Sequence, residues 1–362
     1  MIERVELVER RRQLAPNRLD LLGAQLHGHA DVFSHRMQRT PHTRTGRARH
    51  ALLALTALVL AAGLIPRAAA PARAVAVTFD DLPATPAGAV AADVTSLAEL
   101  THKLLAAVHK HRIPAVGFVN EGQLFVANQG ADALASRTDL LRMWLDAGLE
   151  LGNHTYSHRD LNTMPFDQFQ ADVLCGEIVT RELTKQRGKR LRYFRHPFLH
   201  VGSSLEVRRA FEDFLVKHGY TVAPVTVDND EFVYAAAYAR ALRSGDTAVA
   251  RRIADDYLRY MEEVFTFFED VSKRVTGREI PQVLLLHANT LNADRFDALA
   301  EMLKRRGYRF VSVEQALQDP AYRLRDEFVG APGNSWFNHW EVTAGGPAVP
   351  TPKPPEWVGA LQ

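Results

Sequence analysis

Residues 75–84 read VAVTFDDLPA, an apolar run that stops at two adjacent carboxylates, Asp80 and Asp81. The β-branched and aromatic residues before the pair, and Pro83 after it, are typical of a short buried strand that ends in a turn. Two neighbouring carboxylates repel each other, and a bound cation relieves that repulsion. The pair therefore indicates either a cation site at the end of a strand or a solvated turn.

Similar apolar runs recur along the chain and alternate with helical patterns. The predicted strands are 75–79, 115–119, 149–153, 191–195, 221–227, 282–287 and 308–311, and the predicted helices are 96–110, 138–146, 166–186, 204–218 and 294–306. Several helical patterns stop at a glycine, as helix C-caps do, at Gly148, Gly219 and Gly307. The alternation predicts a parallel α/β fold. A helical insert at 233–279, between the fifth and sixth strands, and an irregular tail at 319–362 interrupt it.

Polar residues gather where the predicted strands end. They are Asp80 and Asp81 on the first strand, Asn153 and His154 on the third, Arg195 on the fourth, Asp228 on the fifth and His287 on the sixth. In a closed parallel barrel the carboxyl ends of the strands form the face that carries catalytic groups. The coincidence predicts an active site at that face.

The segment HTYSH places His154 and His158 four residues apart. On one helical turn the two imidazoles would point the same way and share a metal ion. With Asp81 they would form a set of two histidines and one carboxylate, which leaves a coordination position open for water. Asp80 would then take a proton from that water. Histidine pairs at this spacing also occur without any metal, so the pair alone does not establish a site.

Five short motifs resemble, in order, those of the polysaccharide deacetylases, also called the NodB-homology family or carbohydrate esterase family 4. They are TFDD (78–81), HTYSH (154–158), RHPF (195–198), DNDEF (228–232) and LLH (285–287). The resemblance covers roughly residues 75–317. It implies a distorted (β/α)7–8 barrel and a divalent metal, expected to be Zn²⁺. It also implies removal of N- or O-acetyl groups from a polysaccharide.

The resemblance further implies a role for each matching residue. Asp81, His154 and His158 would bind the metal, and Asp80, braced by Arg195, would be the general base. His287, oriented by Asp228, would be the general acid. The backbone N–H of Phe198 would stabilise the oxyanion, and Leu285 would line the pocket for the acetyl methyl group. The motifs depart from the family pattern at Leu82 (usually Gly), Phe198 (often Tyr) and Glu231-Phe232 (usually Asp-Trp), and the last departure bears directly on Asp228.

Composition excludes several classes of protein. The chain has 362 residues and a net charge of +2, but residues 1–74 hold 12 Arg and only 5 acidic residues. The remainder carries 32 basic and 37 acidic residues, without the basic footprint that nucleic-acid binding needs. Cys175 is the single cysteine, which excludes an internal disulfide framework and a cysteine-rich zinc site.

The N-terminal region has the pattern of an export signal. The apolar run 51–65 is short for a membrane span, and the stretch 37–50 before it contains arginines but no acidic residue. Ala72-Arg73-Ala74 fits a cleavage site that would leave Val75 as the mature terminus. We expect Met37 to be the native start, 1–36 to come from a misplaced start codon, and 37–74 to be a signal peptide. The mature protein, with a catalytic domain at 75–318, would be periplasmic or extracellular without a stable membrane anchor; an uncleaved anchor is the alternative.

Two other functions remain open at the level of sequence. The same fold and metal chemistry would serve a hydrolase of a small amide, a formamide or an acetyl ester, if the 233–279 insert closed the pocket. The third function is a catalytically silent carbohydrate-binding protein, which would not need the ionisable residues Asp80, Asp81, His154, His158 and His287. Trp336 and Trp340 in the tail would either stack on sugar rings or pack against the barrel.

Overall fold

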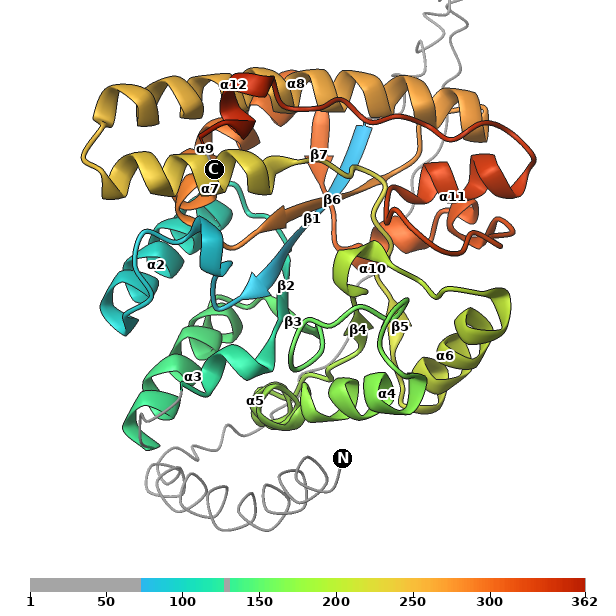
Figure 1. Ribbon diagram of the computed structural model, residues 1–362, viewed down its shortest axis with the longest axis horizontal. Coiled ribbons are helices and arrows are strands. Elements are labelled where there is room, and N and C mark those ends of the chain that lie inside the picture. Colours follow the sequence, from blue (N-terminus) through green and yellow to red (C-terminus); the bar gives the residue numbers. More distant parts are fainter. Residues whose placement is uncertain (1–72, 127–130, 362) are drawn as a thin grey trace, which may run out of the picture. The chain divides into compact units, whose positions relative to one another are not determined.

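A parallel sheet of seven strands organises the protein (Figure 1). The computed structural model describes residues 73–126 and 131–361. The strands are β1 (Arg73–Leu82), β2 (Val116–Val119), β3 (Glu150–Asn153), β4 (Tyr193–Phe194), β5 (Thr221–Val222), β6 (Gln282–His287) and β7 (Tyr308–Phe310). Their order is β5-β4-β3-β2-β1-β6, with β7 paired to the start of β1, and every pairing is parallel. The seven predicted strands are confirmed.

One segment, residues 221–227, joins the two open edges of this sheet. Its first part hydrogen-bonds to β4, where Ala223 N donates to Phe194 O over 2.8 Å. Its last part reaches β6, where Val227 N donates to Val283 O over 3.0 Å and Val227 forms a parallel bridge with Leu284. The predicted strand 221–227 is thus divided between two neighbours, and this division closes the sheet into a distorted barrel.

Helices surround the strands and follow them in the alternating order that the sequence predicts. They are α2 (Val94–Lys110), α3 (Ala131–Asp146), α4 (Phe166–Cys175), α5 (Ile178–Gln186), α6 (Leu205–Lys217), α7 (Glu231–Arg243), α8 (Thr247–Thr276), α9 (Thr290–Arg305), α10 (Val313–Leu317), α11 (Trp336–Thr343) and α12 (Glu356–Gly359). Four 3-10 turns are η1 (Pro86–Gly88), η2 (Glu121–Leu124), η3 (Pro197–Leu199) and η4 (Pro320–Arg323). The segment 233–279 lies mostly in α7 and α8. The single helix predicted over 166–186 is wrong, because the chain breaks at Gly176 into α4 and α5.

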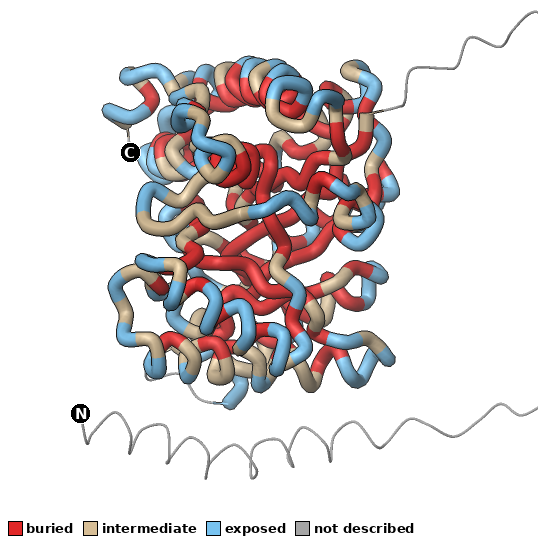
Figure 2. The backbone as a smooth tube through the Cα atoms, turned by 90° about the vertical axis from the view of Figure 1, so that its right-hand side faces the viewer, coloured by how far each residue is buried: buried red, intermediate tan, exposed pale blue. Residues whose placement is uncertain are grey.

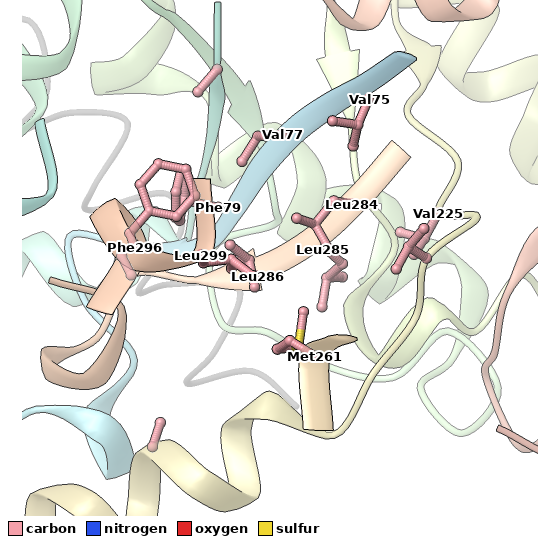
Figure 3. Close-up of a cluster of buried hydrophobic side chains, with 14 of the residues drawn as sticks. Val75, Val77, Phe79, Val225, Met261, Leu284, Leu285, Leu286, Phe296 and Leu299 are labelled. Atoms are coloured by element: carbon pink, nitrogen blue, oxygen red, sulfur yellow. The ribbon is translucent and has the colours of Figure 1, made fainter. Parts of the chain in front are cut away.

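Strand β1 separates an apolar exterior from a barrel interior that becomes polar toward one end. Val75, Val77 and Phe79 pack outward in a large cluster with residues of β6, α8 and α9 (Figure 3). Ala74 and Ala76 face a second cluster with Val116, Phe118 and Val283. Because side chains alternate along a strand, Thr78 and Asp80 continue this inner face. Strands β1, β2, β3, β4 and β6 are buried over almost their whole length (Figure 2), so closely packed strands hold the polar end of the interior.

The tail predicted to be irregular contains η4, α11 and α12 and packs onto the barrel. Trp336 N donates to Val225 O over 2.7 Å, and Ser335 Oγ donates to Thr226 O over 2.7 Å. Trp336 and Trp340 are 7% and 4% exposed, so they are core residues of the tail and not a sugar-stacking surface. No helix within residues 73–126 and 131–361 combines the length and hydropathy needed to cross a bilayer.

The predictions for residues 1–72, including the start at Met37 and most of the signal peptide, lie outside the described residues. Arg73 is described, and it is integrated into the fold. Its guanidinium donates to Glu279 from Nε over 2.6 Å and forms an ion pair with Glu269 from Nη1 over 3.1 Å, while its backbone pairs with Tyr308. Cleavage after Ala74 would remove these contacts.

We therefore propose that, on export, the mature protein begins at Arg73 and not at Val75. Cleavage after Ala72 also has small residues at both recognition positions, Ala70 and Ala72, and it preserves the Arg73 ion pairs. Mass spectrometry of the mature protein, secreted from cells that process it, would measure the terminus. A species that begins at Val75 would contradict this expectation.

Candidate active site

A β-bulge explains how two adjacent aspartates serve one site. In the pairing of β1 with β2, Phe79 lies opposite Gly117, but the next aligned pair is Leu82 with Val119, so β1 carries one extra residue. Asp81 takes up the bulge in the left-handed region, with φ of 65°. A regular strand would turn Asp80 and Asp81 to opposite faces, whereas a bulge re-aims one side chain. Both carboxylates therefore face the polar end of the barrel.

The two histidines of HTYSH come from a loop after β3 and not from the helical turn that the sequence analysis assumed. Thr155 and His158 both have positive φ, of 66° and 51°, so the loop curls back on itself. The imidazole centroids of His154 and His158 lie 4.8 Å apart. The prediction of a helix is wrong, while the prediction that the two rings converge is confirmed.

Asp81, His154 and His158 form a cluster with the donor atoms of a metal site. One ligand atom from each lies within 4.8 Å of the others. Asp81 Oδ1 is 3.7 Å from His154 Nε2 and 3.6 Å from His158 Nε2, and this oxygen is buried without a hydrogen-bond partner. A buried carboxylate oxygen that faces two ring nitrogens suits a cation held between them.

The protonation of the histidines agrees with metal binding. Burial, followed by the charge of His158, holds the pKa of His154 well below its usual range, and burial also lowers the pKa of His158. Neutral imidazoles are the form that binds metals. The Nδ1 atom of His154 lies 2.8 Å from the carbonyl oxygen of Arg195, so Nδ1–H donates there and Nε2 keeps its lone pair for the cluster.

Asp80 lies beside this cluster and is held by Arg195. Arg195 Nη1 donates to Asp80 Oδ2 over 3.4 Å, and its Nη2 and Nε donate to Thr78 Oγ1 and Ala223 O over 3.0 and 2.9 Å. Asp80 Oδ2 is 3.8 Å from His154 Nε2, and Asp80 Oδ1 is buried without a partner. Burial raises the pKa of Asp80 to about 6, although the positive charges of Arg195 and His287 oppose that rise. The carboxyl can therefore change its protonation near neutral pH.

His287 lies opposite Asp80 in the register of β6 with β1, and its orienting carboxylate is Glu231. Its Nδ1 lies 2.9 Å from Glu231 Oε2, and Glu231 is the first residue of α7. The prediction that Asp228 orients His287 is corrected accordingly, because the carboxylate that contacts the ring belongs to Glu231, three residues later in the motif. Burial raises the pKa of Asp228 to about 7. The sequence signal for Glu231 is the departure of this motif from the family pattern at Glu231-Phe232.

The proton on His287 is stabilised by these surroundings. Burial alone lowers the pKa of His287, but the hydrogen bond to Glu231 and the charges of Glu231, Asp81 and Asp80 outweigh it and raise the pKa to about 9. The imidazole therefore carries its proton at neutral pH, the state required of a general acid.

The remaining predicted residues lie as follows. Phe198 has φ of 57° and its ring, 53% exposed, packs 4.6 Å from the ring of His158. Leu285 is 6% exposed and lies two residues before His287, on the same face of β6. Leu82, where the family usually has glycine, is fully buried against Gly117 and does not enter the site.

Two residues that sequence reasoning missed hold the loop that carries His154 and His158. Asp172 of α4 accepts from Ser157 N over 3.1 Å and from Ser157 Oγ over 2.7 Å, and its carbonyl accepts from Tyr156 N over 3.1 Å. A Cβ at Gly176 would lie 2.4 Å from Thr155 C and 2.5 Å from Tyr156 N. The glycine that breaks the predicted helix thus allows α4 to contact the backbone between the two histidines.

Gly176→Ala is expected to lower both stability and metal affinity. The backbone at Gly176 has φ of −82°, which alanine tolerates, so the cost comes from the contact with the loop. We expect a loss of about 1–3 kcal/mol in the free energy of unfolding, the usual cost of overpacking, and weaker binding of Zn²⁺. Denaturant unfolding and calorimetric titration measure the two quantities. Gly359→Ala, where a Cβ meets no atom within 4 Å, is the matched control. Equal stability and equal affinity for Zn²⁺ in the two variants would contradict this expectation.

A family model of known proteins matches the first part of the described fold. Residues 67–222 match the family model of the polysaccharide deacetylases. This match places residues 67–222 in the polysaccharide deacetylase family. This family consists of hydrolases that act on carbon–nitrogen bonds or on esters. The match confirms the resemblance at the level of the family for the motifs at 78–81, 154–158 and 195–198, and the motifs at 228–232 and 285–287 lie beyond it. No curated protein matches the sequence.

Solved structures similar to the deacetylase domain are distant. A family 4 carbohydrate esterase from Streptomyces lividans is 19% identical, with a TM-score of 0.40 over 68% of this chain and 97% of that chain. A peptidoglycan deacetylase from Bacillus subtilis is 20% identical, with a TM-score of 0.41 over 70% and 94%. A family 4 pseudoenzyme from Bacillus anthracis is 16% identical, with a TM-score of 0.42 over 68% and 66%. These similarities are too distant to transfer an activity, and the assignment rests on the family model.

Proposed function

We propose that the protein is an exported, zinc-dependent deacetylase that removes N-acetyl groups from an amino-sugar polymer. The observation that carries the proposal is the convergence of Asp81, His154 and His158 around one point, with Asp80 and His287 beside it. Amide hydrolysis needs an activated water, an oxyanion partner and an acid for a poor leaving group. The five side chains and the cation that they fit supply these three functions.

Each residue has a distinct part in the proposed reaction. A divalent ion bound by Asp81, His154 and His158 supplies Lewis-acid polarisation. Asp80 takes a proton from the attacking water, and Arg195 holds the carboxylate in place. The Phe198 backbone N–H donates to the oxyanion, and Leu285 contacts the acetyl methyl group. His287 gives its proton to the leaving nitrogen, while Glu231 keeps the ring oriented.

An amide is favoured over an ester because of the state of His287. An amine leaves only as it is protonated, whereas an alkoxide or aryloxide needs less help. The ion pair between His287 and Glu231, over 2.9 Å, keeps a proton on the imidazole. This arrangement supports N-deacetylation ahead of O-deacetylation.

A polymer is favoured over a small amide by three exposed phenylalanines near the site, which lie in η3, in the first turn of α7 and at the end of η2. Phe198 packs against His158, Phe232 lies 6.2 Å from His287 and Phe125 lies 5.9 Å from Tyr156, measured between ring centroids. Their exposed fractions are 53%, 48% and 39%. Exposed aromatic surface beside a polar site indicates a binding surface, and aromatic rings suit the apolar faces of sugars.

The test is acetate release from N-acetylglucosamine oligomers of increasing length, peptidoglycan, acetylxylan and a small acetamide. We expect kcat/KM to rise with the length of the oligomer and to be lowest for the acetamide. Best turnover of the acetamide or a formamide would favour the small-amide hydrolase. Binding to the oligomers without acetate release, in metal-loaded protein, would favour a carbohydrate-binding protein.

A further inference from the structure

The carboxylate that contacts His287 is itself held by a network of neutral side chains. Glu231 is fully buried, and besides the imidazole its hydrogen-bond donors are the amides of Asn289 and Asn292 at the start of α9. Asn292 Nδ2 lies 2.7 Å from Glu231 Oε1 and also donates to the His287 carbonyl over 2.8 Å. One amide thus contacts both members of the pair.

Helix α8 fixes the orientation of that amide. The hydroxyl of Tyr257 donates to Asn292 Oδ1 over 2.8 Å, which leaves the Nδ2 group of Asn292 turned toward Glu231. Asn289 Oδ1 accepts from Asn292 N over 2.9 Å, so the asparagine is also held through its backbone. Tyr257, Asn289 and Asn292 are each fully buried.

The charge of the groups that donate to Glu231 matters as much as their number. Three hydrogen bonds stabilise a buried carboxylate in its charged form. Two of these donors are amides, which carry no charge, so the imidazole supplies the positive charge that faces Glu231. A protonated Glu231 would leave its hydroxyl competing with two N–H donors, which is unfavourable in a buried network.

We propose that Asn292, oriented by Tyr257 and supported by Asn289, is a positioning residue that keeps Glu231 ionised and aimed at His287 Nδ1. The ionised carboxylate holds the Nδ1 proton, so that the transferable proton of the imidazolium is the one on Nε2. This inference rests on the proposed deacetylation, and it adds a role for α8 and α9 in delivering the proton to the leaving amine.

The kinetic test compares an N-acetyl oligosaccharide with an activated aryl acetate, whose leaving group needs little acid. Asn292→Leu should lower kcat on the amide by about 10-fold, as expected for losing a hydrogen bond to a charged group, and change the ester rate less than about 2-fold. Tyr257→Phe, which removes only the hydroxyl, should show the same selectivity with a smaller loss. Tyr308→Phe is the matched control, since its buried hydroxyl contacts Glu269 on the same helix, away from His287.

A second readout does not depend on activity. The Nδ1 proton of His287 should give a low-field, exchange-protected proton resonance in the wild type and in Tyr308→Phe. That resonance should shift upfield or disappear in Asn292→Leu and Tyr257→Phe. If the wild type deacetylates nothing, the proposed function fails, and the resonance still decides the inference.

Two results would overturn the inference. An equal loss on amide and ester in both site variants would show a structural role for Asn292. An unchanged resonance together with an unchanged amide rate would show that Glu231 needs neither Asn292 nor Tyr257. If Asn292→Leu fails to fold, Tyr257→Phe, which keeps every group that touches Glu231, decides between the outcomes.

Discussion

Asp80→Asn is expected to keep the bound metal and to lower hydrolysis by about 10²–10⁴-fold, the range for loss of a general base. Asparagine preserves the shape of the side chain but accepts no proton from water. The proposed ligands Asp81, His154 and His158 remain in place, so the metal content should stay that of the wild type. Steady-state kinetics and elemental analysis of the same preparation measure the two effects.

The buried ion pair between Asp80 and Arg195 requires a control. Asp80→Asn leaves a buried guanidinium without its carboxylate, and this lowers stability independently of catalysis. Asp326→Asn breaks another largely buried pair, with Arg208 over 2.6 Å, outside the site. It should lower the unfolding temperature and leave kcat unchanged. Full activity of Asp80→Asn would exclude Asp80 as the base.

His287→Gln should reduce deacetylation of an N-acetyl sugar by about 10²–10⁴-fold while sparing most of the turnover of an activated aryl acetate. The amine leaving group needs the proton that His287 carries, and the aryloxide does not. Kinetics on the two substrates, with metal content determined for the variant, measure the difference.

A second buried histidine gives the matched control. His111 closes the C-terminus of α2, and its Nε2 lies 2.7 Å from Asp297. His111→Gln removes a buried imidazole bonded to a carboxylate and should leave the ratio of amide to ester turnover unchanged. Loss of both activities and of the metal in His287→Gln would instead indicate that His287 binds the metal.

The frame of the site is predictable from the sequence because it depends on strand ends. Each apolar run marks a strand, and the ionisable residues after it mark one face of the sheet. Asp80, Asp81, His154, Arg195 and His287 converge there as the sequence analysis expects. The apolar pattern of the strands and their parallel arrangement are sufficient to predict that these side chains meet at one face.

The local geometry is not predictable in the same way. No alternation of apolar and polar residues marks the bulge that turns Asp80 and Asp81 to one side. The spacing of His154 and His158 suggests a helix, whereas the loop reaches the same convergence through left-handed residues. Glu231 contacts His287 from the first residue of α7, and its other partner, Asn292, lies on a different helix, α9. Contacts between distant segments decide these features, and a single sequence does not show them.

Acetate release by metal-stripped and reloaded protein tests whether hydrolysis depends on a metal ion held by Asp81, His154 and His158. The substrate is an N-acetylglucosamine oligomer, and zinc content is measured in each sample. We expect no release from stripped protein and full recovery with about one equivalent of Zn²⁺ per chain. We expect no recovery in His154→Ala, which should fail to bind the ion. Equal release from stripped and loaded protein, or recovery in His154→Ala, would contradict this dependence.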